Sequence, residues 1–152
     1  MERRLRITLD GGTFGNVSAI RSRTMAAIRD RNNRTTEIAF RMALVRNTIR
    51  GWKLHCRDLP GKPDFYFARA RIAVFIDGDF WHGNPAIVRS TPTTNASYWR
   101  KKIEINRARD LRVTRLLRRS GIRVIRIWES ELKDEQRFKR LVLRIRRRIR
   151  AR

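Results

Sequence analysis

The sequence contains a single cysteine, Cys56, in 152 residues. One cysteine excludes a disulfide within the chain and a zinc site built on several cysteines. The chain also lacks an apolar run long enough to cross a membrane. Its start, MERRLRITLDGG, has basic residues but not the apolar core of a secretory signal. Together these absences predict a cytoplasmic protein in a reducing environment, with no membrane partner.

Acidic residues are also few. The chain has 14 of them against 38 basic residues, which gives a net charge of +24. Only six of the basic residues are lysines, so 32 are arginines. Arginine makes planar, bidentate contacts to phosphate, so this excess favours a nucleic acid as partner. A GC-rich genome would explain arginine in place of lysine, but not the excess of positive charge.

The hydrophobic content of 41% over this length is typical of one globular domain. Residues 1–20 have weak periodicity and a cluster of glycines, which predicts a flexible N-terminal arm before a domain at 21–152. The predicted elements are helices at 24–29, 35–50, 96–120 and 134–152 and strands at 52–56, 65–67, 72–76 and 122–128. This order predicts an α/β fold with a central sheet covered by helices.

Helical spacing assigns an apolar face to each longer helix. The face predicted for the helix at 35–50 consists of Ile38, Met42, Val45 and Ile49. The face predicted for the last helix consists of Phe138, Leu141, Val142, Ile145 and Ile149. We expect both faces to pack on the sheet.

Two carboxylates stand at the ends of consecutive predicted strands. Asp64 precedes the strand at 65–67, and Asp77 follows the strand at 72–76. Each alone is common in a turn, but a short connection between the strands can bring both to one sheet edge. Converging oxygen ligands are what Mg²⁺ requires. We expect the nearby Asp79 to be solvated.

Three further titratable side chains are candidates for chemistry. His82 lies in a polar loop just after the acids, where an imidazole can take a proton from water near neutral pH. Asp110 lies on the otherwise apolar face of its helix and needs a partner, either a histidine, a metal shell or an arginine such as Arg109. Glu37 stands in a first helical turn, where the helix dipole alone would favour it. We expect His55 to be an ordinary strand residue.

The aromatic residues Phe80 and Trp81 are adjacent in a polar loop flanked by glycines. Core packing is the usual role of such side chains. Two adjacent rings cannot easily both face inward, however, and proteins that distort DNA insert apolar wedges between base steps. Trp99, on the following helix, is a third candidate for stacking on bases.

Several segments together resemble the very short patch repair (Vsr-type) endonucleases. They are RSRTMAAIR, DLPGKPDF, AVFIDGDFWHG, YWRKKIEINRARD and GIRVIRIWE, and the similarity extends from about Arg21 to Leu132. The resemblance implies a restriction-endonuclease-like, PD-(D/E)xK-type fold, in which helices flank a central mixed sheet in a single domain. It also implies an Mg²⁺-dependent endonuclease that nicks one strand of duplex DNA beside a T:G mismatch and leaves a 5′-phosphate.

The same residues leave two alternatives open. Related homing-type endonucleases share the set of acids and histidine, so a site-specific homing or restriction-type enzyme that cuts paired DNA is the first alternative. A catalytically silent, basic DNA-binding protein is the second. That protein would bind DNA with a steep salt dependence and give no metal-dependent product.

The resemblance also implies roles for individual residues. Asp64 would be the central metal ligand beside the carbonyl of Ile76, and Asp77 would be a second acid facing the metal. His82 would be the general base, held by Asp110. Glu37 would support the metal through water. We expect two Mg²⁺ ions. The residues implied to contact DNA are Phe80, Trp81, Trp99, Lys102 and Asn106.

Many proteins of this family hold a structural zinc through cysteines and a histidine around the FWH loop and after the WE of the last strand. Here those places are held by Asp79, Asn84 and Ser130. We therefore expect no zinc, and a loop held by packing. We further expect a monomer that acts on double-stranded DNA, cytoplasmic and associated with the nucleoid when bound to DNA.

Overall fold

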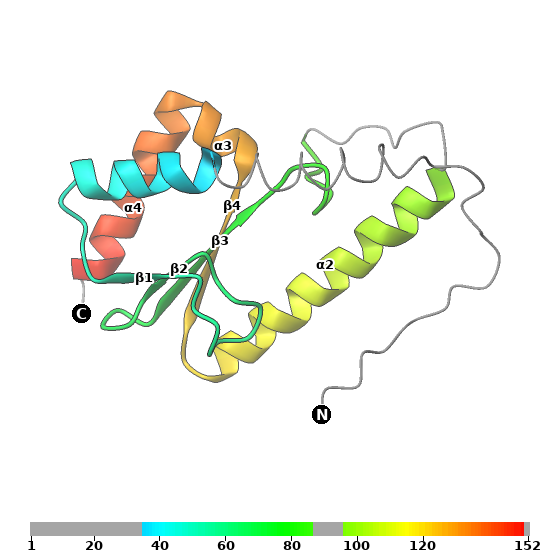
Figure 1. Ribbon diagram of the computed structural model, residues 1–152, viewed down its shortest axis with the longest axis horizontal. Helices are drawn as coiled ribbons and strands as arrows, with labels where there is room; N and C mark the ends of the chain where they lie inside the picture. Colours follow the sequence, from blue (N-terminus) through cyan, green and yellow to red (C-terminus); the bar gives the residue numbers. More distant parts are fainter. Residues whose placement is uncertain (1–34, 87–95, 151–152) are drawn as a thin grey trace. The chain divides into compact units, whose positions relative to one another are not determined.

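A four-stranded mixed sheet forms the centre of the computed structural model, which describes residues 35–86 and 96–150. Its strands are β1 (Trp52–Leu54), β2 (Phe65–Phe67), β3 (Ile72–Asp77) and β4 (Arg123–Trp128), in that spatial order (Figure 1). β1 and β2 are antiparallel, as are β2 and β3, whereas β3 and β4 are parallel. The predicted arm at 1–20 and the predicted helix at 24–29 lie outside the described residues.

The helices cover both faces of this sheet. The helix at 35–46 and α4 (Glu135–Arg150) pack on one face, where the core includes Phe40, Leu44 and Ile145. α2 (Ala96–Arg119) packs on the other face. This arrangement confirms the predicted fold of a mixed sheet flanked by helices. Within the described ranges, no helix is both long and apolar enough to span a bilayer.

Beyond shifts of a single residue, the elements differ from the sequence prediction in three places. The first described helix ends at residue 46, because Thr48 adopts φ +54° and the Ile49 N–H bonds back to the Leu44 carbonyl in a helix-ending turn. β1 ends at Leu54 and not at Cys56, because His55 adopts φ +45°. A short helix, α3 (Glu129–Lys133), separates β4 from α4 and was not predicted.

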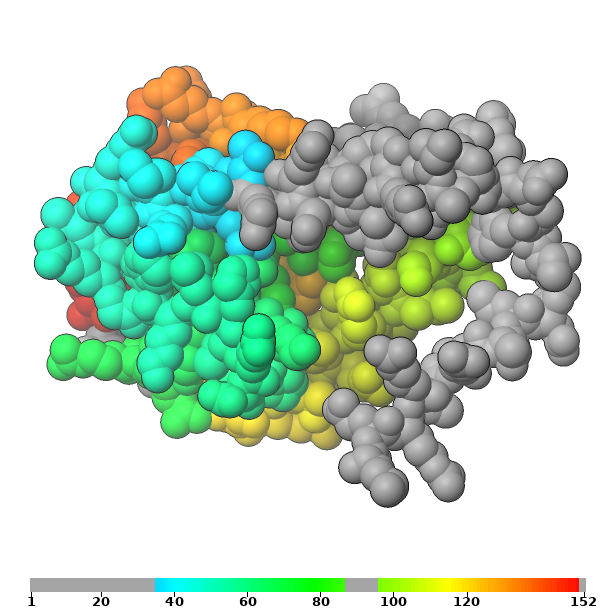
Figure 2. All heavy atoms as spheres, in the orientation of Figure 1, coloured from blue at the N-terminus to red at the C-terminus, as the bar shows by residue number. Residues whose placement is uncertain are grey.

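The apolar face predicted for the first described helix was wrong at three of its four positions; the fourth, Ile49, is buried but lies beyond the end of the helix. Ile38, Met42 and Val45 are 58%, 46% and 55% exposed, whereas Phe40 and Leu44 are fully buried. Both sets have helical spacing, and the helix turns inward the face that carries the phenylalanine. Phe40 packs edge-on against Phe65 of the sheet, with ring centroids 4.9 Å apart. In Figure 2 the atoms of this helix, in cyan, lie at the surface. The predicted face of α4 is confirmed, since Leu141, Val142 and Ile145 are buried.

Strand directions determine where the polar side chains gather. The end of β1, the start of β2 and the ends of β3 and β4 all lie at one edge of the sheet. Asp64 directly precedes β2, and Asp77 is the last residue of β3, level with Trp128. The predicted approach of the two strand-end acids to one edge therefore follows from the observed topology.

Candidate active site

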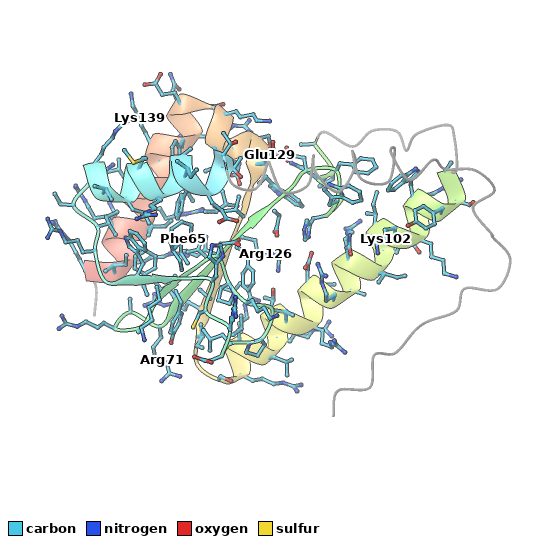
Figure 3. All side chains as sticks on the ribbon, viewed as in Figure 1. Phe65, Arg71, Lys102, Arg126, Glu129 and Lys139 are labelled. Carbon is cyan, nitrogen blue, oxygen red and sulfur yellow. The ribbon has the colours of Figure 1, made fainter. Side chains whose placement is uncertain are left out.

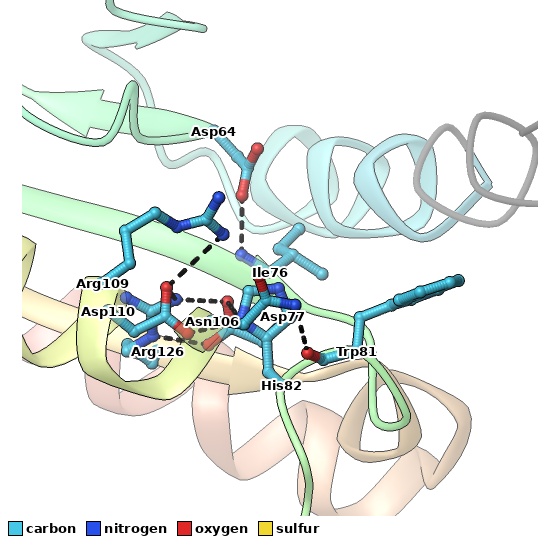
Figure 4. Close-up of polar contacts among 9 residues, drawn as sticks. All are labelled: Asp64, Ile76, Asp77, Trp81, His82, Asn106, Arg109, Asp110 and Arg126. Carbon is cyan, nitrogen blue, oxygen red and sulfur yellow. Dashed lines mark hydrogen bonds and ion pairs between the residues drawn. The ribbon is translucent and has the colours of Figure 1, made fainter. Parts of the chain in front are cut away.

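Asp64 is fixed against β3 by a hydrogen bond. The backbone N–H of Ile76 donates to its Oδ2 at 2.7 Å (Figure 4). Burial raises the pKa of Asp64 to about 6; the bond from Ile76 opposes this rise, and the charges of Glu37 and Asp77 add to it. A carboxylate that is costly to ionise among other carboxylates is well suited to bind a cation.

Asp64 belongs to a first group of possible metal ligands, together with Glu37 and His55. One ligand atom from each of the three residues lies within 4.8 Å of the others. His55 Nε2 is 3.4 Å from Glu37 Oε2. The His55 N–H also donates to the Asp64 carbonyl at 3.1 Å, so antiparallel pairing places these two residues side by side. Two carboxylates and an imidazole fit a divalent ion.

Sequence reasoning missed His55, which it treated as an ordinary strand residue. The signal was available in the turn between the strands. If the PGKP segment closes a hairpin, the residue paired with Asp64 is His55. The positive φ at His55 is uncommon for a residue with a side chain, and such strain is concentrated at functional sites.

A second group joins Asp77, His82 and Asp110. His82 Nδ1 lies 2.5 Å from Asp110 Oδ2 and 3.7 Å from Asp77 Oδ1 (Figure 4). A carboxylate at this distance accepts the Nδ1 hydrogen, so the lone pair of the neutral ring lies on Nε2. The expectation that Asp110 needs a polar partner is met by this histidine.

Arg126 is the second residue that sequence reasoning missed. It comes from β4 and lies between the sheet and α2 (Figure 3). Its Nε and Nη2 donate to the two carboxylate oxygens of Asp77, each at 2.6 Å, and Nη2 is 3.0 Å from Asp110 Oδ1. A basic residue on the α2 side of a parallel strand was the available signal, because that position needs an acidic partner.

Arg126 balances the negative charge of this second group. Burial alone would lower the pKa of Arg126, but its bonds to Asp77 and Asp110 raise it above the ordinary value. Burial would likewise raise the pKa of Asp110, yet the His82 hydrogen bond and the Arg126 charge hold it below its usual range. Asp77 is only 4% exposed, and both its oxygens accept bonds from Arg126, so a metal ion would compete with that arginine.

The three candidate DNA-contacting aromatic residues form one cluster. The ring centroid of Phe80 is 5.3 Å from that of Trp81 and 5.4 Å from that of Trp99. Trp81 and Trp99 are 5.7 Å apart, and Tyr98 extends the cluster on α2. All of these rings pack edge to face and are partly exposed. Their contact with DNA stays a prediction.

The two polar DNA-contacting candidates on α2 differ in their surroundings. The side-chain amide of Asn106 donates to the Trp81 carbonyl at 2.8 Å, so it supports the aromatic loop. Lys102 lies one turn earlier and is partly exposed (Figure 3). Their roles toward DNA also stay predictions.

The loop at 79–84 corrects two expectations. Asp79 is not simply solvated, because it accepts hydrogen bonds from Asn84 and Ser130. The loop is thus held by a polar network and not by packing alone. A carboxylate, an amide and a hydroxyl are a poor donor set for structural zinc, which takes thiolates and imidazoles. These three residues do not fit that ion.

Comparison with known proteins gives a family match. The family model described as "DNA mismatch endonuclease Vsr" matches residues 16–86. This range includes Glu37, Asp64, Asp77 and His82, and it ends before α2.

Curated relatives match a larger share of the chain. The type II nicking enzyme V.NaeI of Lentzea aerocolonigenes is 42% identical over 125 residues, which is 79% of this chain and 74% of the relative. The type II nicking enzyme V.XorIIP of Xanthomonas oryzae is 40% identical over 72% of this chain and 79% of its own. The DNA mismatch endonuclease Vsr of Escherichia coli is 33% identical over 79% and 76%.

Proposed function

Because this chain belongs to the Vsr family of DNA endonucleases, we propose that it is an Mg²⁺-dependent enzyme that nicks one strand of double-stranded DNA at or beside a T:G mismatch. The observation that supports this most directly is the pairing of His82 with Asp110 next to the group of Glu37, His55 and Asp64. A histidine oriented by a carboxylate can act as a general base, and a neighbouring group of candidate metal ligands can bind the ion that activates a phosphate; a phosphodiester hydrolase uses both.

His82 is the general base in this proposal. Its Nε2 takes a proton from water, and the water oxygen attacks the phosphorus of the scissile bond. The bond to the 3′ oxygen breaks, and this oxygen takes a proton from solvent water, so the products are a 5′-phosphate and a 3′-hydroxyl. Asp110 holds the ring in the tautomer with its lone pair on Nε2, and its negative charge stabilises the imidazolium that forms. Arg126 keeps Asp110 ionised and in place.

Asp64 and Glu37 are the residues proposed to hold Mg²⁺, with the Ile76 carbonyl beside them. Their carboxylate oxygens are ligands that suit this ion, and the group of which they are part also includes His55. When bound, the ion neutralises charge on the phosphate and polarises it toward attack. Asp77 contributes to the same proposal as a buried acid whose charge reaches Asp64. The proposal includes two Mg²⁺ ions per active site.

The aromatic cluster is proposed to read the DNA by deforming it. Phe80 and Trp81 precede His82 directly, so rings that enter the base stack would bring the backbone to the general base. Unstacking a step costs roughly a few kcal/mol, which contacts to the rings offset. Lys102 and Asn106 lie on the neighbouring turns of α2 and complete the proposed contact surface with Trp99. The charge of +24 supplies the attraction to the phosphate backbone.

A second candidate is a site-specific nicking enzyme that needs no mismatch. The observation that favours it is the higher identity to the two type II nicking enzymes, 42% and 40%, than to the mismatch endonuclease, 33%. Both candidates use the same chemistry, so they differ only in substrate.

Nicking of matched duplexes tests the proposal. One duplex carries a single T:G mismatch and the other is fully paired. Each is used as a pool of duplexes in which the sequence around that position varies. We expect Mg²⁺-dependent nicks in the mismatched duplex only, and none with His82→Ala. Equal nicking of both duplexes contradicts the mismatch requirement. Nicking that survives His82→Ala contradicts the assigned base, and no nicking with any divalent ion contradicts the enzyme.

One chain carries both groups of residues, so we propose a monomer as the active unit. The protein would reside in the cytoplasm and join the nucleoid through its DNA contacts. Sedimentation of the protein with and without a short duplex tests this proposal by giving the mass of each species. A monomer gives the mass of one chain alone and of one chain with one duplex, whereas a dimer gives a complex that contains two chains.

A further inference from the structure

Two side chains of the loop at 79–84 and one from a distant part of the sequence close the base of that loop. Asn84 Nδ2 donates to Asp79 Oδ1 at 2.6 Å, and Ser130 Oγ donates to the same oxygen at 2.9 Å. The backbone N–H of Ser130 donates to Asp79 Oδ2 at 3.1 Å. We call Asp79, Asn84 and Ser130 the polar clasp. Asp79 thus has both carboxylate oxygens engaged.

The clasp encloses the residues that the proposed chemistry uses. Asp79 immediately precedes Phe80, Trp81 and His82, and Asn84 follows two residues after His82. The Asn84 N–H also donates to the Asp79 carbonyl at 2.8 Å, so backbone and side chain join the same two ends. Asn84 is only 4% exposed, although it is a polar residue in a loop. A buried amide whose Nδ2 and Oδ1 both form hydrogen bonds fixes the loop in one conformation.

Ser130 ties this closed loop to the sheet. It lies in α3, two residues after the end of β4, and β4 is parallel to β3. Because parallel strands end at the same sheet edge, the start of α3 is beside the loop that leaves β3. On the other side, Gly83 lies against α2, where an added Cβ would be 2.6 Å from Ile103 Cγ2. The loop is therefore held between the start of α3, which follows β4, and α2.

We infer that the polar clasp positions His82 and the aromatic rings for catalysis, in the place where a structural metal would otherwise organise the loop. The inference rests on the proposed function, because it assigns the loop a part in nicking. A metal is a poor alternative here, since the amide of Asn84 and the hydroxyl of Ser130 are weak ligands for zinc and already bond to Asp79. The clasp residues are positioning residues, because they act through His82.

Asp79→Ala tests the clasp most directly, since it removes the acceptor for both partners. We expect a loss of about 10- to 100-fold in the single-turnover nicking rate at saturating DNA, the scale that follows from misplacing a catalytic group by about 1 Å. The near-ultraviolet circular dichroism of the packed rings should fall, while the far-ultraviolet spectrum stays. Asp79→Asn keeps an acceptor oxygen and should recover much of both signals. Ser120→Ala, an exposed serine at the end of α2, is the matched control.

The outcomes separate the clasp from the proposed function. An unchanged ring spectrum and nicking rate in Asp79→Ala, with only a lower melting temperature, would overturn the inference. Zinc bound at one ion per chain in the wild type, and lost in Ser130→Ala, would overturn it as well. If the wild type nicks no duplex, the proposed function fails, yet the ring spectrum of Asp79→Ala against Asp79→Asn still decides whether the clasp orders the loop.

Discussion

His82 Nδ1 lies 2.5 Å from Asp110 Oδ2, although the two residues are 28 positions apart and come from a loop and a helix. The contact assigns each ring nitrogen a separate task. Nδ1 donates to the carboxylate, and Nε2 is left to accept a proton. The consequence is that the carboxylate determines whether the histidine can act as a base.

Asp110→Asn tests this dependence. An asparagine amide can donate to Nδ1, which would move the ring hydrogen to Nε2 and remove the base. We expect the nicking rate at saturating DNA to fall by about 10²- to 10⁴-fold, with little change in DNA affinity. Glu104→Gln, an exposed acid on the same helix, is the control and should keep the wild-type rate. A rate within about threefold of wild type in Asp110→Asn would contradict the assigned tautomer.

Asp64 predicts an unusual pH dependence of stability. Its pKa in the folded protein is about 6, above the ordinary 3.8, so the folded state holds this proton more tightly than the unfolded state. The free energy of unfolding of the metal-free protein should therefore fall as pH rises from about 4 to about 6, by about 2–3 kcal/mol from this group. The lowered pKa of Asp110 acts in the opposite sense and only below about pH 4.

Urea denaturation in EDTA at several pH values measures this slope. Asp64→Asn removes the titrating carboxyl group. It should therefore flatten the dependence of the free energy of unfolding on pH between pH 4 and 6, and the variant should be more stable than the wild type at neutral pH. Asp58→Asn, in an exposed turn, should leave the slope as it is. An identical slope in wild type and Asp64→Asn would show that another group is responsible.

His55 predicts a metal preference. An imidazole beside Asp64 and Glu37 favours Mn²⁺ and later transition metals over Mg²⁺ more than carboxylates alone do. We expect His55→Gln to weaken Mn²⁺ binding about tenfold and Mg²⁺ binding much less. Electron paramagnetic resonance of free Mn²⁺ measures the affinity for Mn²⁺. Displacement of bound Mn²⁺ by Mg²⁺ measures the affinity for Mg²⁺. Equal losses for the two ions would place His55 outside the metal shell.

Arg126 predicts a large effect on stability. Arg126→Ala leaves Asp77 buried at 4% exposure without its bidentate partner and next to Asp110. Removing one partner of a buried pair costs about 3–5 kcal/mol. Because the two carboxylates then repel one another, the variant should regain more stability as pH falls than the wild type gains through Asp64. Arg123→Ala, exposed on the same strand, should cost much less, and a similar loss in both variants would contradict the argument.

Much of the fold and of the site followed from local sequence. The run at 72–76 and the long helix after it are strong local patterns, and both are present as β3 and α2. The proximity of Asp64 and Asp77 to one sheet edge followed from consecutive strands with a short connection. The need of Asp110 for a polar partner followed from its place on an apolar helix face, whereas the choice of His82 among the possible partners came from the family resemblance.

The parts that were missed depend on contacts between distant segments. Arg126 contacts Asp77, and Ser130 contacts Asp79, only when β4 lies beside β3. No local sequence pattern predicts that these two strands pair. His55 gains its place from the register of a hairpin. The inward face of the helix at 35–46 was decided by the packing of Phe40 on Phe65, a tertiary contact that outweighs a spacing rule satisfied by two faces.

The parallel pairing of β3 with β4 has a consequence for how this protein becomes active. The pairing spans about fifty positions in the chain and requires α2 to cross between the strands. Non-local contacts of this kind form late in folding, because the intervening loop must close first. Asp77 meets Arg126, and Asp79 meets Ser130, only after that closure. We therefore expect a nascent or partly folded chain to carry its positive charge to DNA without the ability to cut it.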